Sequence, residues 1–453
     1  MSRRQQQRAG ILSRQECQNI VDAVMRLSRA DNVDVNIGSN VTGNTRFAAN
    51  QLSTSGGVEN ANVAIQSHFG PKHAVVQTNN LSDESLERAV RQSEALARLA
   101  PDDPESMPPL PPQQYTTVDA WSDTTANLSP AERARAAMAV LEQTRQGGDL
   151  NAAGYIVTGA GSSAVANKAG LFAYHRNTFN NYTLTVRTND GTGSGWASAD
   201  NFDWRQLDTA RVAQRAVEKA RASRSPVAIE PGRYTVIMEP QAVGDLVQLM
   251  AFAMDARAAD EGRSAFVKAE GGNKIGERVV DPRVTILSDP QDPDLRTQPF
   301  DGQGLPQPRR VWIENGVLRE LIYSRFWAQR TNRQPTGFPN SVKMMGGEQS
   351  IEQLIAGTER GVLVTRLWYL RQVDPRTILY TGLTRDGTFL VENGRITQSL
   401  RNFRFNDSPL FMLNNLEALG RAERLGGTEA GGNIVMPAVK ARDFSFTSLS
   451  EAV

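Results

Sequence analysis

The sequence predicts an α+β protein: two small α/β-type domains, then a mostly antiparallel β domain with one packed helix. Three observations support this fold class. Helix-like and strand-like hydrophobic patterns alternate over the first half of the 453 residues. Residues 101–112 interrupt them with six prolines. From residue 232 onward, short strands separated by glycine turns dominate. We expect domain limits of 1–112 (N-terminal domain with its linker), 113–228 and 229–453.

The first domain begins with a helix-like pattern over residues 14–30, where apolar residues recur at helical spacing. Residues 33–37 then alternate apolar and polar side chains, as a half-buried strand does, and residues 63–69 form a second such run. Ser82 is placed to cap a helix that continues to about Leu99. The proline-rich segment that follows predicts an extended linker, because prolines cannot sustain a helix or a central strand.

The middle domain opens with the capping box Ser129–Glu132, which places Pro130 at the first helical position. We expect strands around residues 154–158, 171–175 and 182–188. Asp208 then begins a helix with alanines and valines on one side.

The C-terminal domain starts with a predicted strand, Tyr234–Met238, and a helix that opens at Pro240 and carries apolar residues to Ala253. Asn315-Gly316 and Asn393-Gly394 each lie between apolar flanks. Such pairs favour type I′ hairpins, in which both turn residues adopt positive φ. Asp386-Gly387 predicts a third tight turn.

The amino-acid composition excludes several classes of function. The chain has 50 basic and 49 acidic residues, a formal net charge of +1, which argues against nucleic acid as the main partner. Three histidines and one cysteine exclude disulfide frameworks, cysteine-rich zinc modules and iron–sulfur clusters. Neither a secretory signal nor a run long enough to span a membrane is visible, so we expect a cytoplasmic protein.

Three motifs point weakly to ligands. Residues 157–164 match G-x-G-x-x-A, but no helix or acidic partner follows as a dinucleotide site requires, so a glycine-rich turn is the better interpretation. His68 and His73 are not spaced as ligands on one helical face, and no acidic partner is expected nearby, so we expect no metal there. The acidic loop at 289–301 lacks the glycine and terminal glutamate of a calcium loop, which favours a solvated turn.

Two further residues carry reactive groups. Cys17 lies within the first amphipathic helix, where an inert thiol, buried or partly exposed, is expected. His175 lies in an aromatic, strand-like run and is interpreted as a satisfied polar position and not as a base. From its residues alone, the chain offers no catalytic constellation.

About ten short motifs are recognisable in the C-terminal half of the chain. They are Gly262–Phe266, Gly276–Val279, Val284–Ile286, Asp301–Gly304, Ile313–Leu318, Thr336-Gly337, Gly361–Trp368, Asp374-Pro375, Thr381–Thr384 and Val391–Gly394. In their order and spacing, these motifs resemble the TldD/PmbA family of metalloproteases, and weaker similarity covers nearly the whole chain.

The resemblance implies a paired protease. In the family, a TldD-type subunit holds a metal through an H-E-x-x-x-H helix and a late cysteine. Its TldE/PmbA-type partner has the same fold without these ligands, and the two subunits enclose a channel for an extended peptide. The motif positions correspond here to Val247, Gln248 and Phe252. Neither a histidine after His175 nor a cysteine after Cys17 exists to replace them.

The sequence therefore predicts no catalytic residue, no bound metal and no cofactor in this chain. Our leading hypothesis is a metal-free TldE/PmbA-like subunit that pairs with a catalytic TldD-like chain and helps to admit unfolded peptides. It involves neither nucleic acid nor membrane. A stand-alone homodimeric peptide-binding or scaffold protein is the alternative, and an enzyme with a different, non-metal site is a third, weaker possibility.

Overall fold

The computed structural model describes residues 10–427 and 429–450. The first half contains α1 (Arg14–Leu27), β1 (Asn32–Ala48), β2 (Gln51–Phe69), β3 (Lys72–Thr78), α2 (Asp83–Leu99), α3 (Asp123–Ala126), α4 (Pro130–Gln146), β4 (Leu150–Asn167), β5 (Phe172–Thr188), β6 (Ser194–Asn201), η1 (Trp204–Gln206) and α5 (Thr209–Ala222).

The second half contains β7 (Arg233–Met238), α6 (Pro240–Val247), α7 (Leu249–Ala253), α8 (Ala256–Asp260), β8 (Ile286–Ser288), β9 (Arg310–Glu314), β10 (Val317–Leu318), α9 (Arg325–Arg330), β11 (Val342–Met344), α10 (Ile351–Ala356), β12 (Arg360–Val364), β13 (Leu367–Asp374), β14 (Leu379–Thr384), β15 (Thr388–Glu392), β16 (Arg395–Ser399), β17 (Phe403–Asp407), α11 (Pro409–Asn414), β18 (Leu416–Gly426) and β19 (Gly431–Leu449). The expected α+β class is confirmed.

Strands from both sides of the proline-rich segment form one six-stranded sheet, in the order β3-β2-β1-β4-β5-β6. All its pairs are antiparallel. The ladder between β1 and β4 runs from Asp34 opposite Asn167 to Phe47 opposite Gly154. Segments 1–112 and 113–228 thus share a backbone ladder, and their limits as separate domains stay a prediction.

The strands of this sheet are much longer than the sequence patterns indicated. The predicted strands at 171–175 and 182–188 are parts of one strand, β5. The interpretation of residues 157–164 as a glycine-rich turn is wrong, because they lie within β4. A Cβ on Gly159 would lie 2.7 Å from Cζ of Phe179 on β5, so glycine leaves room for that ring.

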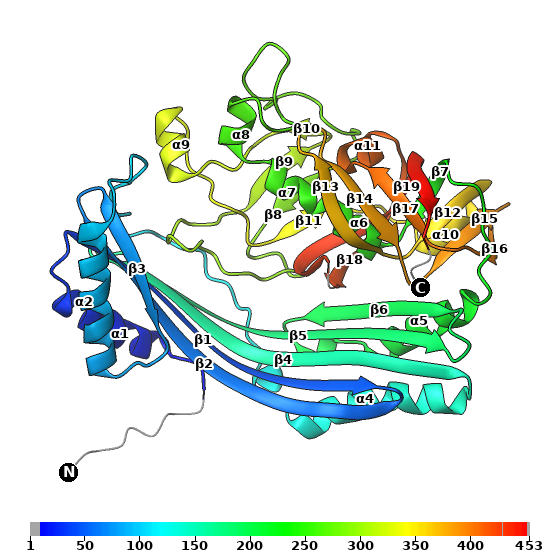
Figure 1. The fold of residues 1–453 in the computed structure, drawn as a ribbon, viewed down its shortest axis with the longest axis horizontal. Coiled ribbons are helices and arrows are strands. Elements are labelled where there is room, and N and C mark those ends of the chain that lie inside the picture. The colour runs from blue at the N-terminus through cyan, green and yellow to red at the C-terminus, as the bar shows by residue number, and fades with distance from the viewer. Residues whose placement is uncertain (1–9, 428, 451–453) are drawn as a thin grey trace.

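Helices cover one face of the long, curved sheet (Figure 1). Val33 and Val35 of β1 pack with α1 and α2 at one end, and Phe47 packs with α4 and α5 at the other. Because side chains alternate along a strand, Asp34 and Arg46 point to the opposite face. That face, which we call the inner face, lies toward the C-terminal domain (Figure 1).

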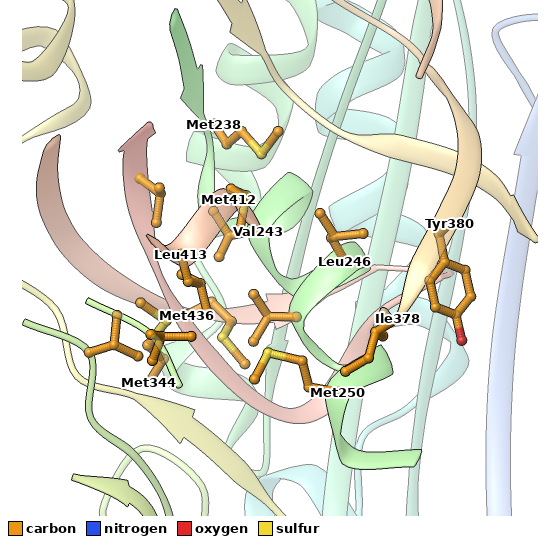
Figure 2. Packing of buried hydrophobic residues seen from close by; sticks show 14 of the residues in the cluster. Met238, Val243, Leu246, Met250, Met344, Ile378, Tyr380, Met412, Leu413 and Met436 are labelled. Carbon is orange, nitrogen blue, oxygen red and sulfur yellow. The ribbon is translucent and has the colours of Figure 1, made fainter. Parts of the chain in front are cut away.

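The C-terminal domain is built on a 13-stranded sheet, most of whose pairs are antiparallel. Its main path runs β10-β9-β8-β11-β19-β7-β12-β15-β16. The helix that opens at Pro240 is present, but Gln248 divides it into α6 and α7. Figure 2 shows Val243, Leu246 and Met250 of these helices within the large apolar cluster of this domain.

The turns and helix caps that the sequence predicts are present in the structure. Both Asn-Gly hairpins are confirmed: Asn315 and Gly316 have φ values of 50° and 78°, and Asn393 and Gly394 have 51° and 75°. The capping box at Ser129 and the cap at Ser82 are also confirmed. Within the described residues, no helix is long and apolar enough to cross a membrane.

The proline-rich segment packs between the two halves of the molecule. Asn167 Nδ2 on β4 donates to the carbonyl of Leu110 at 2.9 Å, and just after the segment Tyr115 Oη donates to the carbonyl of Gly304 at 2.7 Å. Glu105 forms an ion pair with Arg257 of α8 at 2.6 Å. The segment therefore fixes the sheet against the C-terminal domain.

Candidate functional site

The three residues predicted to replace the metal motif lie where α6 meets α7, and they do not share one face. Val247 ends α6 and is 2% exposed in the apolar cluster of the domain. Phe252 on α7 is 67% exposed and contacts the ring of Phe338, with 5.8 Å between ring centroids. Neither side chain carries an atom that could bind a metal.

Gln248, the residue between the two helices, uses its amide for structure. Its Nε2 donates to the carbonyl of Glu429 at 2.6 Å, just before β19. Its backbone N–H donates to Gly244 and its carbonyl accepts from Ala251, both at 3.1 Å. The side chain thus joins the helix junction to the loop between β18 and β19.

The space beside Val247 is small and apolar. A cavity of about 20 Å³ is lined by Val247, Met250, Met254, Trp312 and other apolar residues. A buried water needs polar partners as well as volume, and Trp312 already donates its indole N–H to Ser288 at 3.0 Å. We therefore expect this cavity to be dry.

One ionisable group on α6 escaped the sequence analysis. Asp245 is 1% exposed, and burial raises the pKa of its carboxyl to about 7. The side chain of Gln241 donates to Oδ1 at 2.7 Å, and the backbone N–H of Leu367 donates to Oδ2 at 3.0 Å. An aspartate among the apolar residues of a buried helix was the available signal. The carboxyl links α6 to β13.

The paired histidines have acidic neighbours that their spacing did not reveal. His68 and His73 lie opposite each other on β2 and β3, with ring centroids 5.5 Å apart. His68 Nε2 donates to Asp34 on β1 at 2.8 Å, and His73 lies 3.8 Å from Asp103 of the proline-rich segment. They line a cavity of about 360 Å³ on the inner face, beside Arg325 of α9.

The other reactive residues are buried. Cys17 lies on the buried face of α1, and burial raises the pKa of its thiol to about 12, as expected of an inert cysteine. His175 is also buried, and burial lowers its pKa to about 4. The expectation that His175 is fully satisfied is wrong, because its Nε2 has no hydrogen-bond partner in the described part of the chain.

Several aspartates of the acidic loop have partners within the chain. Lys343 of β11 lies 2.9 Å from Asp292 and 2.8 Å from Asp294. Asp301 accepts from the backbone N–H groups of Gln303 and Leu305 and so closes its own turn. Across residues 10–427 and 429–450, no group of three or more His, Cys, Asp or Glu side chains could hold a metal ion.

Comparison with known domains defines the class of protein. Residues 231–448 match the PmbA/TldA metallopeptidase C-terminal domain, and residues 123–224 match the central domain of the same proteins. The chain belongs to the TldD/PmbA family. The resemblance drawn from its short motifs is thereby confirmed.

Individual relatives agree with this assignment. A metalloprotease of Methanothermobacter thermautotrophicus is 27% identical over 254 residues, 52% of either chain. Metalloprotease PmbA of Escherichia coli O157:H7 is 23% identical over 174 residues, 37% of this chain and 38% of that protein. The matched region therefore spans about half the length of the first relative and 38% of the length of the second.

Among solved structures, TldE from Thermococcus kodakarensis has the same fold. Its TM-score with this chain is 0.84 at 18% sequence identity, covering 95% of this chain and 99% of the other. The likeness extends over the six-stranded sheet as well as the C-terminal domain.

Proposed function

We propose that this chain is a metal-free, TldE/PmbA-like subunit of a cytoplasmic metalloprotease. It pairs with a catalytic TldD-like chain, and together the two form a channel that admits unfolded peptides. On this proposal the chain does not hydrolyse peptides alone and contributes to proteolysis only within the pair.

The packing at the junction of α6 and α7 is the observation that carries the proposal. A catalytic zinc site needs three protein ligands and an open position for water. Val247 is instead part of the apolar core, Gln248 holds a loop, and the largely exposed ring of Phe252 contacts only another ring, that of Phe338, among the aromatic side chains described. These residues do not fit a metal.

The histidines elsewhere do not replace this site. His68 and His73 lie on the first sheet, where Asp34 and Asp103 are their neighbours. His175 is buried within the same sheet. A zinc site also needs ligands arranged around one point, and only two of these imidazoles lie near each other.

Extended peptides fit the sheet architecture. An unfolded chain can add to an exposed strand edge through main-chain hydrogen bonds, which accept any sequence. β3 and β6 are the edge strands of the six-stranded sheet, and β16 is an edge of the C-terminal sheet. The inner face between the two sheets offers side chains that would contact such a peptide.

Co-expression tests the proposal. This chain is produced alone and together with a relative that carries H-E-x-x-x-H, and each preparation is assayed for complex formation and for cleavage of an unfolded peptide. We expect cleavage from the pair and none from this chain alone. Cleavage by the isolated chain would contradict the subunit role, and exclusive homodimers in the presence of the relative would favour the scaffold alternative.

A further inference from the structure

The six-stranded sheet contains a strand whose outer edge is only partly covered. β1 pairs with β2 from Gln51 to His68, whereas β3 pairs only with Val63–Phe69. Among the residues that the structure describes, residues 51–62 of β2 therefore have a partner strand on one side only. We call this stretch the open edge. It lies at the margin of the sheet farthest from the C-terminal domain (Figure 1).

The ladder with β1 shows which main-chain groups of the open edge point outward. Val58 lies opposite Thr42, and the Thr42 hydroxyl donates to the Val58 carbonyl at 3.4 Å, so this carbonyl points toward β1. Main-chain groups alternate between the two edges of a strand, so those of Ser55, Gly57 and Glu59 point away from β1. Their N–H and C=O groups are the ones that a further strand would bind.

The open edge lacks the usual protection against such pairing. Every residue from Gln51 to Asn60 is exposed, although successive side chains point to opposite faces of the sheet. Native edge strands are commonly guarded by lysine, proline or a covering helix or loop. Residues 51–62 include neither lysine nor proline, and Glu59 is their one charged residue. The ladder with β1 shifts register at Ser53, close to the hairpin end, and is regular from Thr54 to Asn62.

The surroundings of this edge favour a folded sheet over a lone peptide as its occupant. Peptides that add to a sheet obtain specificity from pockets for alternate side chains. Because residues 51–60 are exposed on both faces, the described part of the chain offers an added peptide few side-chain contacts there. A strand that already belongs to a folded sheet is held extended by its own domain, so it loses less conformational freedom on pairing.

The open edge is compatible with a second copy of itself in antiparallel orientation. When the two strands are centred on Gly56, Ser55 of one copy lies opposite Gly57 of the other, so outward main-chain groups meet outward groups. In the same register Glu59 lies opposite Ser53. The two carboxylates therefore do not face each other, and small residues occupy the centre of the contact.

The hairpin that joins β1 to β2 leaves room for this register. Its turn residues, Ala49 and Asn50, have φ values of 50° and 56° and make a tight connection. With the strands centred on Gly56, Gln51 at the start of β2 falls opposite Ala61 of the other copy. β3 begins to pair only at residue 63, so the new ladder ends before it meets β3.

We propose that the open edge is the interface of a homodimer, in which β2 of a second copy pairs antiparallel with β2 and joins the two six-stranded sheets into one. A two-fold axis normal to the sheet relates the copies, as antiparallel pairing of identical strands requires. The helices of both copies then cover the same face, and both inner faces stay open. The dimer does not depend on the proposed protease role, because a TldD-like chain still has access to the inner face.

Sedimentation velocity of the full chain over a range of concentrations measures the dimer and its dissociation constant. Two variants at one site test the interface, Ser55→Lys and Ser55→Glu. Ser55 is exposed and lies diagonal to Glu59 of the second copy, within reach of a long side chain. The matched controls are Gln398→Lys and Gln398→Glu, at an exposed residue of the edge strand β16.

We expect the parent chain to form a dimer whose dissociation constant is lowered by Ser55→Lys and raised by Ser55→Glu. The two variants should differ by at least about fivefold at low ionic strength, because the new charge meets Glu59 in two symmetric contacts. The difference should shrink as salt is added, and the Gln398 variants should dimerise like the parent. A parent chain that stays monomeric at every concentration would overturn the proposal, as would a dimer that responds alike to both charges at Ser55.

Hydrogen exchange of the unmodified chain locates the interface without any substitution. The amides of Ser55 and Gly57 point outward, whereas that of Val58 points toward β1. We expect the two outward amides to exchange more slowly as the dimer forms, and the Val58 amide to change little. Dimerisation without slower exchange at Ser55 and Gly57 would refute the open edge as the contact. Neither measurement involves a relative or cleavage, so the co-expression experiment remains a separate test of the protease role.

Discussion

Two regions of this chain differ in burial and polarity: one is a buried apolar junction, and the other is an exposed, positively charged surface. At the junction of α6 and α7, where the resemblance places the metal of catalytic relatives, Val247 is buried in an apolar cluster. On the inner face of the six-stranded sheet, Arg46 and Arg187 are exposed, and the nearby Arg366 stacks on Trp196. The first region contributes stability, and the second presents charged side chains at the surface.

The difference shows where substitutions can be tolerated. Removing atoms from the junction leaves a cavity in a packed core, which lowers stability. When an exposed guanidinium is removed, water fills its place and stability changes little. Substitutions in the two regions are therefore expected to differ in the size of their effect on stability.

Leu246→Ala is expected to have the largest effect. Leu246 is fully buried on α6, so its truncation should lower the free energy of unfolding by about 2–5 kcal/mol. Phe252→Ala, five residues after Val247 but largely exposed, should cost less than about 1 kcal/mol. Urea denaturation measures both. Equal losses would mean that the junction is not packed as described.

Asp245→Asn should change how stability depends on pH. Because burial raises the pKa of Asp245 to about 7, the folded chain keeps this carboxyl protonated over a range in which the unfolded chain has lost the proton. This group therefore stabilises the fold fully below pH 4, and that contribution is lost as the pH rises through 7.

The variant should lack this part of the slope between pH 4 and pH 7, although it is expected to be less stable overall. Gln241 and Leu367 each donate a hydrogen bond to a different carboxyl oxygen of Asp245. The asparagine side chain has only one oxygen, so one of these two donors would lose its acceptor. The comparison is made by denaturation of both chains at several pH values. Parallel stability profiles would show that Asp245 is ionised in the fold.

The smallest effect is expected on the inner face of the six-stranded sheet. Arg46→Gln with Arg187→Gln should change the free energy of unfolding by no more than about 0.5 kcal/mol per site, because both side chains are exposed. Thermal denaturation of the double variant and the parent chain measures this difference. A large loss of stability would make these arginines structural and would weaken the contrast between the two regions.

Features set by neighbouring residues were predictable from the sequence. The Asn-Gly turns and the caps at Ser82 and Ser129 depend on local φ values and hydrogen bonds, and the structure contains all of them. The apolar face of the helix opening at Pro240 was equally clear, since periodicity records burial directly.

Features set by distant residues were not predictable. The ladder between β1 and β4 joins residues more than a hundred positions apart, and glycines such as Gly159 obscure the strand pattern. The sequence predicted Asp386 only as a turn residue. Its contacts with Ser194 and Arg366 were not predictable, because these partners lie outside that turn. His68 and Asp34 likewise lie on different strands, so their contact could not be predicted from the sequence.

Metal analysis of the purified chain tests the central claim most directly. The chain is expressed in zinc-supplemented medium, dialysed without a strong chelator and analysed by mass spectrometry, beside a relative that carries H-E-x-x-x-H. We expect background zinc in this chain and a stoichiometric amount in the relative. Stoichiometric zinc in the isolated chain, with peptide cleavage that a chelator abolishes, would contradict the metal-free subunit role.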